Sequence, residues 1–227
     1  MTYPIKRAAA VFACSAATLV LAATAQAEGI YVSGKISGST FGHTIERNTG
    51  GVVLPVPDTG GVSNVEETEF SGGVGIGYLK NFADNKLFAG IEGYYDVEYA
   101  STRNINGVLV TELDLNATYG VRGLLGVNAT DKLSLYAHGG LAVLDFDIKT
   151  SYTFAPPVRE ASATESAFSY GFGASYKINH SISLFSEYTQ ITDVSFKAIP
   201  EVAGGTNRVN PNDVDLRKIS LGLRYNF

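Results

Sequence analysis

Residues 219–227 read Ile-Ser-Leu-Gly-Leu-Arg-Tyr-Asn-Phe, a strict alternation of large apolar residues with small or polar ones. Neighbouring side chains in an extended strand point to opposite faces of the sheet. The alternation therefore predicts a β-strand with one apolar and one polar face.

Seven further runs show the same period of two. They cover residues 30–41, 70–78, 87–99, 113–125, 133–143, 168–178 and 182–189. Each run has about ten residues, the length with which a tilted strand crosses the hydrocarbon core of a membrane. No apolar run after residue 28 is long enough for a membrane-spanning helix, so a helical membrane protein is excluded.

The connections between these runs alternate in length. Residues 42–68, 100–111, 149–165 and 192–214 form long connections, and residues 80–86, 128–132 and 179–181 form short ones. All prolines after residue 28 fall in the long connections, where no ladder hydrogen bond would be lost: Pro55, Pro57, Pro156, Pro157, Pro200 and Pro211. This pattern predicts an all-β, eight-stranded antiparallel transmembrane β-barrel with four long extracellular loops and three short periplasmic turns.

The residues on the two faces decide between a membrane barrel and a soluble one. A soluble lipocalin-like barrel would carry many Lys, Glu and Thr residues on its water-facing exterior. Here the polar face is mainly Gly, Ser and Ala with isolated charges, which suits the narrow interior of an eight-stranded barrel. The 25 Gly, 13 Tyr and 12 Phe residues, without a Gly-X-Y period, also exclude a disordered or collagenous chain.

The first 27 residues have the features of a secretory signal peptide. Lys6 and Arg7 precede an apolar run, and Ala25 and Ala27 supply the small residues expected before cleavage at Glu28. We therefore expect residues 28–227 to form the barrel, without the single cysteine, Cys14. This part has 15 basic and 22 acidic residues, a net charge of −7, which argues against a nucleic-acid partner.

Several segments carry a family resemblance. The alternating C-terminal residues Leu221, Leu223, Tyr225 and Phe227 resemble the signal by which the outer-membrane assembly machinery recognises barrels. The segments at residues 121–126, 135–142 and 171–177 resemble the opacity-protein and OmpA-like small barrels of Gram-negative bacteria, often called the porin family. The resemblance implies location in the cell outer membrane among lipid and lipopolysaccharide, and roles in envelope integrity, surface antigenicity or host contact.

Isolated charges on the polar face predict an ion network inside the barrel. Glu92 lies as many residues after the short connection 80–86 as Arg122 lies before the short connection 128–132. Adjacent strands should therefore bring the two side chains to the same depth. Glu187 is expected against Arg224 or Lys218, with Lys35 beside them. Buried charges must be paired, which predicts either structural plugs or a gate in a narrow ion pathway.

The residues that could act in catalysis or bind a metal show no spacing typical of an active site. His43, His138 and His180 are far apart along the chain, and we expect no metal ligands, cofactor or catalytic group among them. A lipid-modifying enzyme would need His43 with Ser39 and an acid from the group Glu66, Glu67 and Glu69. Acidic residues near the long connections are expected to be solvated, or to share divalent cations with lipopolysaccharide phosphates: Glu66, Glu67, Glu69, Glu112, Asp114, Asp145, Asp147, Asp213 and Asp215.

Three functions remain open from the residues. The first is a structural and surface-interaction role through the long connections. The second is a narrow channel for ions or small solutes, although an eight-stranded lumen is only wide enough to be filled by side chains. The third is the lipid-modifying enzyme.

Overall fold

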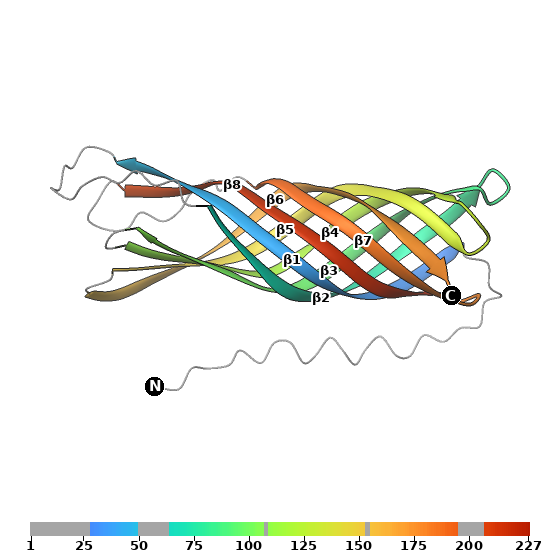
Figure 1. The fold of residues 1–227 in the computed structure, drawn as a ribbon, viewed down its shortest axis with the longest axis horizontal. Coiled ribbons are helices and arrows are strands. Elements are labelled where there is room, and N and C mark those ends of the chain that lie inside the picture. Colours follow the sequence, from blue (N-terminus) through green and yellow to red (C-terminus); the bar gives the residue numbers. More distant parts are fainter. Residues whose placement is uncertain (1–27, 50–63, 107–108, 153–154, 195–206) are drawn as a thin grey trace, which may run out of the picture.

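The computed structural model describes residues 28–49, 64–106, 109–152, 155–194 and 207–227 (Figure 1). The expected leader, including Ala25 and Ala27, lies outside the described residues. Eight strands are present in this part of the chain: β1 (Gly29–Thr49), β2 (Asn64–Phe82), β3 (Leu87–Asn106), β4 (Leu109–Asn128), β5 (Leu133–Tyr152), β6 (Ala155–Lys177), β7 (Ile182–Val194) and β8 (Asn207–Asn226). No helix among the described residues is long and apolar enough to cross a membrane.

The strands form one closed barrel in sequential order. Each strand pairs antiparallel with the next, and β8 returns to β1 with a register that runs from Tyr31 opposite Asn226 to Thr49 opposite Asn207. Closure matters in a membrane because an open sheet edge would leave backbone groups without hydrogen bonds in hydrocarbon. The predicted eight-stranded antiparallel barrel is confirmed.

The two faces of the wall differ as the alternation predicts. Large apolar side chains of all eight strands are exposed on the outside, and serines and charged residues are buried inside. Glycine on the inner face leaves room for larger neighbours. A Cβ at Gly171 would lie 1.9 Å from the Tyr188 carbonyl oxygen and 2.7 Å from Nε2 of His138.

Among the side chains that the structure describes, an exposed apolar belt covers the half of the barrel next to the short turns. Towards the long connections it ends at residues such as Phe70, Tyr99 and Phe168. The strands of about twenty residues continue beyond it, and Figure 1 shows their ends projecting from the barrel body at the side opposite the C-terminus. About ten tilted residues cross the hydrocarbon core, so strands of this length extend beyond it into water.

Two expected long loops are replaced by paired strands. β3 and β4 stay paired out to Asn106 opposite Leu109, and β5 and β6 out to Tyr152 opposite Ala155. The expected connections 100–111 and 149–165 are therefore mostly β-ladder. Pro156 and Pro157 lie in β6 at a register irregularity, where a missing N–H is tolerated, and Pro211 lies in β8 opposite Ile45. The three short turns are confirmed.

A β-bulge at Asn116 changes which residues of β4 face the lumen. Leu115 pairs with Phe146 while Ala117 pairs with Asp145, so Asn116 is the extra residue. Such an insertion reverses the faces on one side of it. Leu113 and Leu115, which simple alternation places on the lipid side, are buried inside the barrel instead.

Candidate functional site

The lumen next to the apolar belt is occupied by a group of four charged residues, which we call the lower ion group: Glu92, Arg122, Glu187 and Arg224. Glu92 and Arg122 are direct cross-strand partners in β3 and β4. Arg122 donates to Glu92 through Nε at 2.9 Å and Nη2 at 2.6 Å, and Nη2 also reaches both oxygens of Glu187 at 2.9–3.0 Å. One guanidinium thus bridges two buried carboxylates.

Two tyrosines complete the hydrogen bonding of these carboxylates. The Tyr31 hydroxyl donates to Glu92 at 2.6 Å, and the Tyr136 hydroxyl donates to Glu187 at 2.7 Å. Arg224 lies over the Tyr31 ring, with its guanidinium carbon 4.4 Å from the ring centroid, and near the rings of Tyr136 and Phe185. Its nearest carboxylate oxygen is Oε2 of Glu92, 4.0 Å from Nη2.

A second set of charges, the upper ion group, lies farther from the short turns. It consists of Lys35, Asp96, Glu98 and Lys218. Asp96 lies 3.0 Å from Nζ of Lys35 and 3.0 Å from Nζ of Lys218, and Lys218 also donates to Glu98. Each ion group holds two acids and two bases, so each is electrically balanced.

The structure sorts the predicted network residues differently from the expectation. It places Glu92 against Arg122 as expected. Glu187, however, binds Arg122 and neither Arg224 nor Lys218, while Lys35 and Lys218 bind acids of β3. Asp96 and Glu98 were missing from the predicted network, although they share the inward face of β3 with Glu92. The pairing of each lumen acid with a particular base depends on the relative stagger of strands that are not neighbours. Local alternation along one strand carries no information about this stagger.

Beyond the upper ion group, on the side away from the short turns, the lumen is filled by an apolar plug. This plug was not predicted. Its centre includes Leu115, Leu144, Phe146 and Leu216, all at most 1% exposed. The other members are Ala100, Leu113, Ala142, Ala167, Ile191 and Val194. Bulges at residues 115–117 and 191–194 turn Leu113, Leu115 and Val194 inward. The other members continue the alternation of the lumen-facing residues on their strands.

The candidate catalytic residues are not assembled in the described part of the chain. Ser39 is buried and hydrogen bonded to Ser71 and Glu98, and Nε2 of His138 lies 3.4 Å from the Thr189 hydroxyl. His180 lies in a short turn. The side chains of His43, Glu66 and Glu67 lie outside the described residues.

Three of the acidic residues near the long connections are hydrogen bonded within the wall. Asp114 accepts from Lys149, Asp147 from Ser162 and Asp145 from Thr164. In the described segments no group of three His, Cys, Asp or Glu side chains is arranged to hold a metal ion. The side chains of Asp213 and Asp215 lie outside this part.

The C-terminal strand presents its apolar residues to the lipid. Leu221, Leu223 and Tyr225 are exposed on the outer wall, and the Tyr225 ring packs edge-on against Phe227 with a centroid distance of 5.1 Å. The Phe227 N–H bonds to the Ile30 carbonyl at 3.1 Å, which closes the barrel at its last residue. The recognition of this strand by the assembly machinery stays a prediction.

Residues 8–227 match the family described as outer membrane protein beta-barrel domain. The chain belongs to this family. It is accordingly an outer-membrane β-barrel protein of Gram-negative type.

Named relatives agree with this location. The 31 kDa outer-membrane immunogenic proteins of Brucella melitensis biotype 1 and Brucella suis biovar 1 are each 27% identical over 175 residues, which cover 74% of this chain and 65% of the relative. The chain thus spans just under two thirds of the length of these relatives.

Two solved structures, besides these relatives, are similar to the chain. Neisserial surface protein A is 14% identical, with a TM-score of 0.45 and coverage of 90% of this chain and 100% of its own. Ail, the attachment invasion locus protein of Yersinia pestis, is 16% identical, with a TM-score of 0.43 and coverage of 88% and 99%.

Proposed function

We propose that the protein is a sealed barrel with a structural role in the outer membrane. Its projecting strands form a surface that acts as an antigen or as a contact surface. The observation that carries this proposal is the filled lumen. Two balanced ion groups and the apolar plug follow one another along the barrel axis, and water-filled conduction needs a continuous polar path. The narrow-channel alternative lacks such a path among the described residues.

The lower and upper ion groups act as structural fillers in this proposal. Eight charges in a narrow lumen would be costly if any stood alone. Four acids and four bases balance each other, and the hydroxyls of Tyr31 and Tyr136 add a hydrogen bond to each carboxylate of the lower ion group. A gate would instead require a charged group that moves between two arrangements.

The projecting halves of β3–β6 offer a polar, ordered outer surface. Lys149 and Asp114 form a cross-strand ion pair at 2.7 Å, with side chains 38% and 27% exposed. The hydrogen bond to Asp114 raises the pKa of Lys149 above its usual value. Ladders of this kind hold an epitope rigid, which lowers the entropic cost of recognition. The immunogenic character stated for the Brucella relatives supports the proposal.

Shortened hairpins test the surface role. Residues 103–112 and 150–159 each begin and end at a cross-strand pair, Arg103 with Glu112 and Thr150 with Arg159. Replacing each segment by Asn-Gly keeps a two-residue hairpin and leaves the apolar plug intact. We expect the trimmed barrel to insert and to show the heat-dependent gel mobility of the full chain, but to lose most recognition by antisera raised against intact cells. Full retention of recognition would contradict the surface role.

The absence of cysteine after residue 28 allows a clean control for orientation. Cysteine placed at Asn116 or Ser162, both exposed on the projecting half, should react on intact cells with a maleimide that does not cross membranes. Cysteine at Asn85, in the β2–β3 turn, should react only after lysis. The reverse pattern would place the projecting strands in the periplasm and overturn the proposal.

A further inference from the structure

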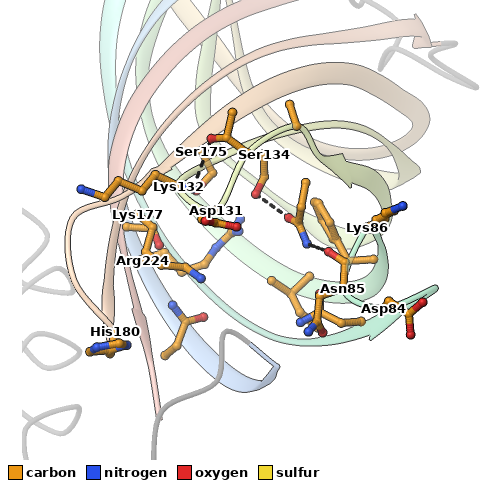
Figure 2. Close-up of a pocket in the computed structure, with 18 residues that line it drawn as sticks. Asp84, Asn85, Lys86, Asp131, Lys132, Ser134, Ser175, Lys177, His180 and Arg224 are labelled. Carbon is orange, nitrogen blue, oxygen red and sulfur yellow. Dashed lines mark hydrogen bonds between the residues drawn. The ribbon is translucent and has the colours of Figure 1, made fainter.

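The barrel opens at its short-turn end into a cavity of about 590 Å³, which we call the turn-end vestibule. It lies between the three short turns and the last residues of β8 (Figure 2). Its volume is in the range of small-molecule sites. The apolar plug and the ion groups close the lumen above it, so the vestibule is accessible only from the periplasmic side.

Cationic side chains from all three short connections line the vestibule. Lys86 comes from the β2–β3 connection, Lys132 from the β4–β5 connection and Lys177 from the end of β6. Figure 2 shows Lys132 and Lys177 on one side of the vestibule and Lys86 on the other. With Arg224 there are four cations against two acids, Asp84 and Asp131, in a chain whose overall charge is −5.

Arg224 supplies the specific feature of the vestibule. It lines the cavity although only 4% of its surface is exposed. Nε and Nη2 of its guanidinium are buried and have no hydrogen-bond partner among the described residues. Oε2 of Glu92, 4.0 Å from Nη2, is already bonded to Tyr31. The lower ion group balances the charge of Arg224, so Arg224 offers unused N–H donors held in place by the Tyr31 ring.

We propose that the turn-end vestibule is a binding site for a small soluble anion that carries carboxylate or phosphate groups. A planar guanidinium with free N–H groups matches the oxygens of these groups in pairs. The three lysines around it add attraction without fixed geometry. The hydroxyl of Ser183, a residue that lines the vestibule and faces Arg224 across the β7–β8 ladder, is a further donor. This site is independent of the surface role.

The test is a titration of the folded, ¹⁵N-labelled protein in detergent micelles with inorganic phosphate and with citrate, followed by NMR shifts of the turn amides. We expect saturable shifts at the three short turns. The triple variant Lys86→Gln, Lys132→Gln, Lys177→Gln should weaken binding about tenfold, which corresponds to three modest exposed charge contacts. Lys80→Gln is the matched control, because Lys80 lies at the same end but on the outer wall and does not line the vestibule.

Arg224 itself is tested with Arg224→Lys, which keeps the charge and loses the planar fork. We expect this variant to weaken citrate binding at least about fivefold. Lys86 and Lys132 are exposed and Lys177 is half-buried, and none of the three belongs to an ion group or to the apolar plug. The lysine variants therefore decide the proposal if Arg224→Lys fails to fold. No saturation with either anion up to about 10 mM would overturn the proposal. Equal weakening by Lys80→Gln and the triple variant would overturn it as well.

Discussion

Arg122 lies directly opposite Glu92 across the β3–β4 ladder and donates two hydrogen bonds to it, at 2.9 and 2.6 Å. The same guanidinium holds Glu187. Removing Glu92 therefore leaves Arg122 one partner, whereas removing Arg122 leaves two carboxylates without their shared base. We expect Glu92→Ala to cost about 3 kcal/mol of unfolding free energy and Arg122→Ala to cost more.

The double variant tests whether the two residues act as a pair. Its loss should be smaller than the sum of the single losses by at least about 1 kcal/mol. Urea unfolding followed by far-UV circular dichroism is suitable, since the chain has no tryptophan. The half-exposed pair Asp114 and Lys149 is the control and should couple by less than about 1 kcal/mol. Additive losses for Glu92 and Arg122 would show that the lower ion group does not stabilise the barrel as a unit.

The apolar plug predicts different costs for inward and outward leucines of β5. Leu144 is fully buried in the plug, and Leu141 is 66% exposed on the lipid side. Leu144→Ala leaves a cavity and should cost about 3 kcal/mol, whereas Leu141→Ala leaves none and should cost clearly less. The unfolding assay in lipid vesicles measures both. Equal losses would mean that the plug is not tightly packed.

The bulge at Asn116 predicts that a deletion is worse than a substitution. Deleting Asn116 shifts β4 by one residue and turns Leu113 and Leu115 outward, which empties part of the plug. Asn116→Ala keeps the extra residue and should change stability by less than about 0.5 kcal/mol. Heat-dependent gel mobility and urea unfolding should separate the two variants. A deletion as stable as the substitution would show that the bulge does not set the faces of β4.

The β2–β3 turn predicts a stabilising substitution. Ala83, Asp84 and Asn85 all have positive φ, between 51° and 64°. Alanine is strained there and glycine is not. We expect Ala83→Gly to raise the unfolding free energy by up to about 1 kcal/mol and the β-branched Ala83→Val to lower it. Destabilisation by Ala83→Gly would mean that loss of chain entropy outweighs the relief of strain.

Strand number, antiparallel order and the outer face follow from the sequence because they are local consequences of alternation and connection length. The pairing of Glu92 with Arg122 was predicted in the same way, from the equal distances of the two residues from the short connections. The apolar plug followed only in part. Leu144, Phe146 and Leu216 continue the alternation of lumen-facing residues on β5 and β8. Leu113, Leu115 and Val194 are turned inward by bulges that leave no mark in the hydropathy pattern.

The extent of the strands was also harder to predict. Polar residues such as Thr102, Arg103 and Glu112 resemble loop residues, yet they continue the β3–β4 pairing. The partners of Glu187, Lys35 and Lys218 depend on contacts across the lumen between strands that are not neighbours.

The central claim is that the lumen is sealed, and single-channel recording in planar bilayers tests it most directly. Protein whose heat-dependent gel mobility shows it to be folded should give no stable conductance steps over the baseline. Reproducible steps from the folded wild-type protein would contradict the account and favour a narrow channel through the two ion groups.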